Sequence, residues 1–148
     1  DPVALLLPQL MREIGDSGTV FVWNRVFEMT RHKEMAAIHP AYAEFLARLN
    51  ERIFDLADFI KNGWYLHPDF KGRWSLKNVL PVMVPALTYE SLHIQNGSMA
   101  SAAWWDVTQR QNPALDREVV RENLKQYCEL DTRAMVRILE KIADIGRI

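Results

Sequence analysis

The fold is decided by the stretch Thr19-Val20-Phe21-Val22-Trp23-Asn24-Arg25-Val26-Phe27-Glu28. Its first five residues are β-branched or aromatic, too few to make a helix, and apolar on both faces. This pattern predicts a strand that is buried on both faces, as strands are in parallel sheets. A helix is predicted to begin at Arg25, so Asn24 lies at the junction between strand and helix.

The segments around this strand predict a helix-rich α/β chain. A second candidate strand covers residues 52–56, and the two helical segments between the strands make a crossover long enough for a parallel pair. Helical periodicity and capping residues predict helices over residues 2–14, 25–37, 41–50, 76–84, 97–107 and 116–142. We therefore expect a buried parallel strand pair flanked by helices, with a structured loop over residues 61–74 and a short extended piece at residues 64–66.

Composition indicates a folded domain. The chain has 148 residues, of which 49% are hydrophobic and 25% are charged, so we expect residues 1–148 to form a single domain. The net charge of -1 argues against a protein that coats DNA. The single cysteine, Cys128, excludes an internal disulfide framework and is typical of a cytoplasmic protein. No apolar run reaches the roughly 20 residues that span a bilayer, so no membrane location is expected.

A phenol and a carboxylate lie four residues apart in the last predicted helix, at Tyr127 and Asp131. This spacing places both on one helix face, within a stripe of apolar residues. A carboxylate there is unfavourable unless it is paired, hydrogen-bonded or bound to a metal. Asp131 is therefore a candidate functional residue. The alternative is that Asp131 lies at the edge of the stripe, where it is solvated or pairs with Arg117, Arg121 or Arg133.

An amide and a carboxylate follow the first strand, at Asn24 and Glu28. The carboxyl ends of parallel strands are where open α/β sheets bind their ligands, which makes both residues candidates for a site. The simpler interpretation is helix capping. Asn24 would then be the N-cap, and Glu28 would complement the helix dipole from the first turn.

Taken together, these two motifs resemble those of a known nuclease family. Asn24-x-x-Phe27-Glu28 after a strand is similar to the second exonuclease motif of DnaQ-like proofreading nucleases, which usually ends in Asp. Tyr127-x-x-x-Asp131 on a late helix is similar to their third motif in its tyrosine form. A wider set of segments resembles a bacterial domain-of-unknown-function family regarded as a divergent relative of these nucleases: His67-Pro68-Asp69-Phe70-Lys71-Gly72, Val79-Leu80-Pro81, Ile94-Gln95-Asn96-Gly97 and Tyr127-Cys128-x-Leu130-Asp131-Thr132.

The resemblance implies an RNase H-like 3′-5′ exonuclease fold and hydrolysis of single-stranded DNA or RNA ends with two Mg²⁺ or Mn²⁺ ions. It implies that Asp131 is a metal ligand and that Tyr127 orients the attacking water. Glu28 would replace the second-motif acid as a catalytic residue and metal ligand. The same resemblance implies substrate contacts for three residues near the first strand, Asn24, Phe27 and Arg31.

The first motif of these nucleases, Asp-x-Glu on an opening strand, does not precede Asn24. The resemblance therefore implies that the chain is the C-terminal part of an incomplete exonuclease-like domain and is inactive by itself. The unpaired sheet edge would be completed by leading strands elsewhere or by a second copy of the chain, in a homo-oligomer. One alternative is a non-catalytic nucleic-acid-binding or protein-interaction module on a degenerate nuclease fold. Another is a structural helical domain in which the motifs are coincidental.

Aromatic and basic residues alternate in the loop over residues 61–74. This combination is typical of platforms that bind single-stranded nucleic acids. The interpretation that we favour is a loop folded onto the core, with its aromatic side chains buried. The residues concerned are Trp64, Tyr65, His67, Phe70, Lys71, Arg73 and Trp74.

Overall fold

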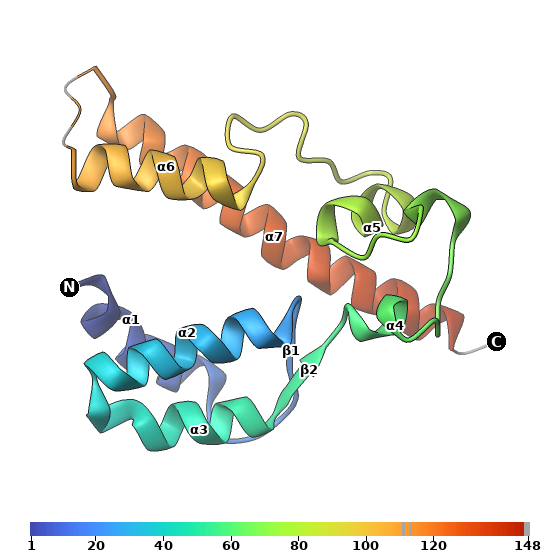
Figure 1. Ribbon diagram of the computed structural model, residues 1–148, viewed down its shortest axis with the longest axis horizontal. Coiled ribbons are helices and arrows are strands. Elements are labelled where there is room, and N and C mark those ends of the chain that lie inside the picture. The colour runs from blue at the N-terminus through green and yellow to red at the C-terminus, as the bar shows by residue number, and fades with distance from the viewer. Residues whose placement is uncertain (111, 113, 147–148) are drawn as a thin grey trace. The chain divides into compact units, whose positions relative to one another are not determined.

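The computed structural model describes residues 1–110, 112 and 114–146. The chain divides into two compact units, Asp1–Tyr65 and Leu66–Ile148 (Figure 1). The structure is a helix-rich mixture of helices and one small parallel strand pair, as the sequence predicts. That the two units form a single domain stays a prediction.

The strand pair lies in the first unit. β1 (Val20–Val22) runs parallel to β2 (Ile53–Asp55), with Phe21 opposite Phe54 and Val22 opposite Asp55. The prediction that β1 is buried on both faces is wrong, because Phe21 is 40% exposed while Val22 is buried. The reason is that the hydrophobic core packs against Val20, on the face opposite Phe21.

Helices of the first unit build its core. The core is a cluster of buried side chains from α1 and α3, Leu7, Phe45, Leu46 and Leu49. α2 packs beside α3. The N-terminal helix begins where the sequence predicts, because the Asp1 side chain accepts a hydrogen bond from the backbone N–H of Val3. The elements are α1 (Pro2–Ile14), α2 (Arg25–Ile38), the 3₁₀ turn η1 (Pro40–Tyr42), α3 (Ala43–Glu51) and α4 (Asp58–Lys61).

The second unit is organised around its last helix. α7 packs against both α5 and α6, and its residues Ala134 and Ile138 are fully buried. Residues 64–66 span the boundary between the two units. They do not form the extended piece that the sequence predicts, because the backbone N–H of Tyr65 bonds back to the carbonyl of Phe59. The elements are η2 (Pro68–Phe70), α5 (Leu76–Met83), α6 (Gly97–Thr108) and α7 (Arg117–Ile145).

Within the described part of the chain, none of the helices combines the length and the apolar character needed to cross a bilayer.

Candidate functional site

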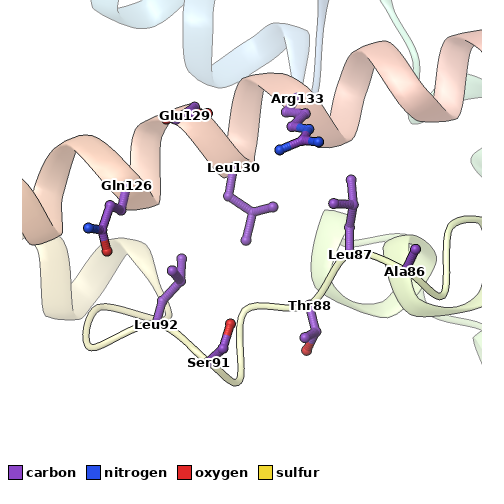
Figure 2. Close-up of a pocket in the computed structure, with 9 residues that line it drawn as sticks. All are labelled: Ala86, Leu87, Thr88, Ser91, Leu92, Gln126, Glu129, Leu130 and Arg133. Carbon is purple, nitrogen blue, oxygen red and sulfur yellow. The ribbon is translucent and has the colours of Figure 1, made fainter.

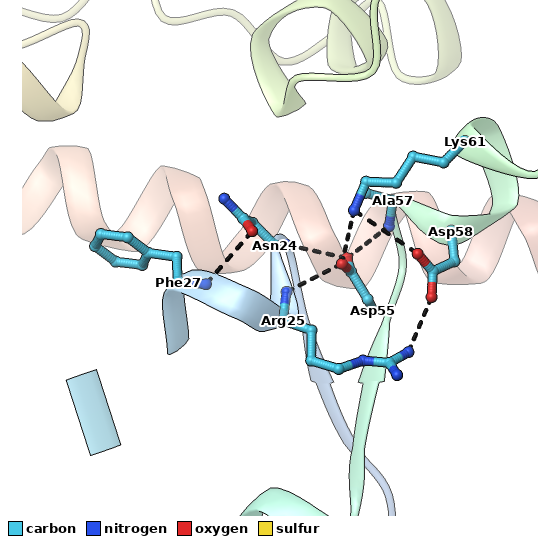
Figure 3. A network of polar contacts seen from close by, with 7 residues as sticks. All are labelled: Asn24, Arg25, Phe27, Asp55, Ala57, Asp58 and Lys61. Atoms are coloured by element: carbon cyan, nitrogen blue, oxygen red, sulfur yellow. Dashed lines mark hydrogen bonds and ion pairs between the residues drawn. The ribbon is translucent and has the colours of Figure 1, made fainter. Parts of the chain in front are cut away.

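The turn between β1 and α2 holds Asn24 in an uncommon backbone conformation (Figure 3). Its φ of 81° and ψ of 75° lie in the left-handed region, which asparagine adopts more readily than most residues. The Asn24 side-chain oxygen accepts a hydrogen bond from the backbone N–H of Phe27 at 3.4 Å. The capping interpretation of Asn24 is therefore confirmed, and substrate binding by this residue stays a prediction.

Asp55, at the end of β2, ties this turn to the neighbouring strand. Its side chain is 2% exposed and accepts four hydrogen bonds. Oδ1 accepts from the backbone N–H groups of Asn24 and Ala57, both at 3.0 Å. Oδ2 accepts from the backbone N–H of Arg25 at 3.0 Å and from Nζ of Lys61 at 2.9 Å.

These four donors decide the ionisation and the role of Asp55. Burial by itself would raise the pKa of the Asp55 carboxyl, but the hydrogen bonds from Arg25, Lys61, Asn24 and Ala57 together hold that pKa below its usual value. A carboxylate offers about four lone-pair sites. Because all four are used within the protein, Asp55 is a structural clamp and has no free position for a metal ion.

The sequence did contain a signal for Asp55 that our interpretation of it missed. Asp55 is the last residue of the second parallel strand, at the same sheet edge as Asn24. Ligands of open α/β sheets bind at the carboxyl ends of the strands, and this made Asp55 as much a candidate as Asn24. What the sequence did not contain was the direction of the side chain, which points at the backbone of the turn (Figure 3).

A second ion pair lies beside this clamp. Arg25 Nη2 is 2.9 Å from Asp58 Oδ2, and Lys61 Nζ is 3.7 Å from Asp58 Oδ1. The Lys61 ammonium thus lies between two carboxylates, those of Asp55 and Asp58. This arrangement pairs two cations with two carboxylates at the strand ends, although Nε of Arg25 is buried without a hydrogen-bond partner among the described residues.

Glu28, Phe27 and Arg31 lie on the first two turns of α2. Glu28 is half-buried, and its burial raises the pKa of its carboxyl, an effect that the nearby His32 partly opposes. Phe27 is 54% exposed, and the Arg31 guanidinium lies 5.3 Å from the centre of its ring. Arg31 also pairs with Glu34 at 2.7 Å. An accessible ring beside a cation is compatible with the substrate contacts that were predicted, which remain predictions.

Asp131, in the second unit, is held by phenol groups. Tyr89 Oη donates a hydrogen bond to Asp131 Oδ1 at 2.5 Å. The ring of Tyr127 lies 6.1 Å from that of Tyr89. Burial, together with hydrogen bonding to Asp131 and the negative charge of that residue, raises the pKa of both phenols well above the usual value for tyrosine. Both hydroxyls therefore stay protonated at neutral pH, and that of Tyr89 donates to the carboxylate.

The alternative that Asp131 pairs with an arginine is wrong within the described residues. Arg121 pairs with Glu118, and Arg117 donates to the carbonyl oxygen of Val107. Arg133 lines a pocket together with Glu129 and Leu130, and no ion pair joins it to Asp131 among the described residues. The sequence contained no signal for Tyr89, which lies 42 positions away from its partner Asp131.

The aromatic residues of the 61–74 loop have different environments. In the first unit, Trp64 is 63% exposed and packs edge-on against Phe59. In the second unit, Phe70 is 3% exposed, whereas Trp74 remains exposed. The favoured interpretation, a loop with buried aromatic side chains, holds for Phe70 and is wrong for both tryptophans.

Metal binding needs more carboxylates than these clusters supply. Across residues 1–110, 112 and 114–146, no three His, Cys, Asp or Glu side chains gather into a group that could hold a metal ion. Glu28 belongs to the first unit and Asp131 to the second. In the part of the chain that the structure describes, no group of carboxylates is therefore suited to hold two divalent ions, and a shared site for Glu28 and Asp131 stays a prediction.

Comparison with known proteins identifies relatives but no solved structure. A family model described as "Domain of unknown function (DUF2779)" matches residues 1–75. The chain is 31% identical over 137 residues to the uncharacterized protein MG366 homolog of Mycoplasma pneumoniae. This match covers 83% of the chain and 20% of that protein. The chain is also 30% identical over 146 residues to the uncharacterized protein UU173 of Ureaplasma parvum. This second match covers 86% of the chain and 21% of that protein. The chain thus spans about one fifth of the length of these relatives. No solved structure matches it.

Proposed function

The chain belongs to the DUF2779 family, and from that premise we propose that it is part of an RNase H-like exonuclease-type domain. The proposed substrate of the parent protein is a single-stranded DNA or RNA end. The chain would contribute two of the nuclease motifs, Asn24-x-x-Phe27-Glu28 and Tyr127-x-x-x-Asp131. The remaining carboxylates would come from other parts of the parent protein.

The observation that carries this proposal is the setting of Asp131. Asp131 accepts a hydrogen bond from the protonated phenol of Tyr89, and it lies at the motif position where the nuclease resemblance requires an acid. A phenol that stays protonated is able to orient a water molecule by hydrogen bonding, which is the role proposed for Tyr127. Glu28 supports the proposal independently, because it is a half-buried acid after a parallel strand.

Activity of the parent protein tests the proposal. A protein that contains this chain together with the flanking sequence found in its relatives should shorten a labelled single-stranded oligonucleotide in Mn²⁺. Asp131→Ala should abolish the shortening, whereas Asp144→Ala, which changes an exposed acid on the same helix, should preserve it. Shortening that persists in EDTA or in Asp131→Ala would contradict the proposal. The chain alone should leave the oligonucleotide intact.

A second candidate function is a non-catalytic nucleic-acid-binding or protein-interaction module on a degenerate nuclease fold. Two observations favour it. All four hydrogen-bond acceptor sites of the Asp55 carboxylate are occupied by protein donors, and Asp131 already accepts a hydrogen bond from the phenol of Tyr89. Retention of oligonucleotides by the parent protein, without hydrolysis in any divalent metal, would select this alternative.

We also propose a location and an assembly for the parent protein. The single cysteine, Cys128, supports a reducing compartment such as the cytoplasm. Two strands of three residues make a marginal sheet, which supports completion of that sheet by further strands or by a second copy of the chain.

A further inference from the structure

A pocket in the second unit lies outside the clusters described above. It has a volume of about 310 Å³ and lies between the 86–92 segment and α7. Figure 2 shows the side chains of Leu87, Leu92 and Leu130 converging on its interior. Polar side chains surround this apolar centre: Thr88, Ser91, Gln126, Glu129 and Arg133.

Arg133 in this pocket differs from the neighbouring arginines of α7. Arg121 pairs with Glu118 at 2.8 Å, and Arg137 pairs with Glu140 at 2.8 Å. Glu129 precedes Arg133 by four residues, a spacing that favours an ion pair on a helix. Among the described residues, however, Arg133 makes no ion pair or hydrogen bond. Its charge is therefore available to a ligand in the pocket.

We infer that this pocket binds the base of a nucleotide, with its faces against the three leucines and its polar edge toward Arg133, Ser91 and Gln126. A base has apolar faces and an edge of donors and acceptors, which matches a lining of this kind. An aliphatic side chain of a protein partner would bury the same polar groups without hydrogen-bond partners, which is unfavourable. The volume lies at the small end of the range for ligand pockets, which suits one base.

A second pocket supports the end of a nucleic-acid strand as the ligand. It measures about 220 Å³, shares Leu87 and Thr88 with the first, and adds Lys77 and Tyr89 to its lining. Tyr89 is the residue that donates to Asp131. A nucleotide chain that leaves the first pocket past Thr88 would thus meet a second cation, Lys77, on the way to the Tyr89–Asp131 pair.

This inference rests on the proposed function for the choice of ligand but does not require hydrolysis. The test is a titration of the ¹⁵N-labelled chain with AMP and UMP in EDTA, followed by NMR, with ribose 5-phosphate and inorganic phosphate as probes that lack a base. The mononucleotides should shift the amide signals of Ser91, Leu92, Leu130 and Arg133, and the probes without a base should not.

Two variants make the titration specific. Arg133→Gln should weaken mononucleotide binding by about tenfold, as expected for loss of one charge-assisted hydrogen bond. Its matched control is Arg137→Gln, which removes an exposed arginine one turn away and should leave the affinity unchanged. Ser91→Phe should fill the pocket and abolish the shifts, and the amide spectrum of each variant reports whether it is folded.

Several outcomes would overturn the inference. They are equal shifts with ribose 5-phosphate, equal affinities in the two arginine variants, and no saturable shift at millimolar mononucleotide. The result separates this inference from the proposed nuclease activity. Base binding by a parent protein that hydrolyses nothing contradicts only the nuclease proposal, and hydrolysis without base binding in this pocket contradicts only this inference.

Discussion

Asp55 organises the β1–α2 turn because one buried carboxylate can satisfy several backbone donors at once. Two of its bonds reach Asn24 and Arg25, the residues at which the strand changes into a helix. The left-handed conformation of Asn24 brings these consecutive N–H groups toward the same acceptor. Because these bonds hold the β1–α2 turn in place, they also position the start of α2, the helix that carries Phe27, Glu28 and Arg31.

Asp55→Asn should destabilise the first unit by about 2–4 kcal/mol, since it removes a buried ion pair and turns an acceptor into a donor facing other donors. Urea unfolding followed by circular dichroism measures the loss. Asp58→Asn is the matched control and should cost less than about 1 kcal/mol, because its pair with Arg25 is partly exposed. Equal unfolding midpoints for the two variants would show that the clamp contributes little.

The same carboxylate predicts a pH dependence of stability. The folded pKa of Asp55 is lowered, so its contribution is fully present above the unfolded pKa of about 4. It is lost as the pH falls through the lower folded pKa, because the unfolded chain binds the proton more readily. The difference in unfolding free energy between the wild type and Asp55→Asn should therefore shrink below about pH 4.

At the scale of elements, Tyr89 connects the segment between α5 and α6 to α7. The hydroxyl of Tyr89 bonds to Asp131, and that of Tyr127, on α7, lies 3.9 Å from the position that a Cβ on Gly97 would occupy. The Asp131 carboxylate joins two segments that are distant in sequence, in addition to any chemical role.

Asp131→Asn should lower the pKa of Tyr89 and Tyr127 toward the usual value of about 10, because it removes the negative charge that disfavours tyrosinate. The ultraviolet absorbance of tyrosinate, followed on raising the pH, measures this change. In Asp144→Asn, which alters an exposed acid on the same helix, the titration should match that of the wild type. A wild-type titration curve in Asp131→Asn would mean that Asp131 does not hold the two phenols in solution.

At the scale of the whole molecule, the residues of the two nuclease-like motifs belong to different compact units. Glu28 belongs to the unit of residues 1–65, and Tyr89, Tyr127 and Asp131 belong to the other. The family match at residues 1–75 covers the Asn24–Glu28 motif, whereas the relatives extend over more than four fifths of the chain. Joint action of Glu28 and Asp131 is proposed for the parent protein, and kinetics of that protein test it.

Residues that act as a unit have effects on rate that do not add. In the parent protein with Mn²⁺, Glu28→Gln and Asp131→Asn should each reduce kcat/KM by at least the roughly 10- to 100-fold seen on loss of an outer-shell partner. The double variant should be no slower than the slower single variant. Glu34→Gln and Asp144→Asn, which change exposed acids on the same two helices, are the controls. Multiplicative losses in the double variant would place Glu28 and Asp131 in independent roles.

The sequence by itself determined the longer helices and the strand pair, because periodicity and capping act over a few residues. The bounds of α1, the parallel pairing and the N-cap at Asn24 were all predicted from local patterns. Only the tertiary structure decided the exposure of Phe21, the saturation of Asp55 and the partner of Asp131. These features depend on groups brought together from positions 30 or more residues apart, such as the Asp55 carboxylate with the backbone N–H of Arg25 and the Tyr89 hydroxyl with Asp131. No local pattern in the sequence specifies such contacts.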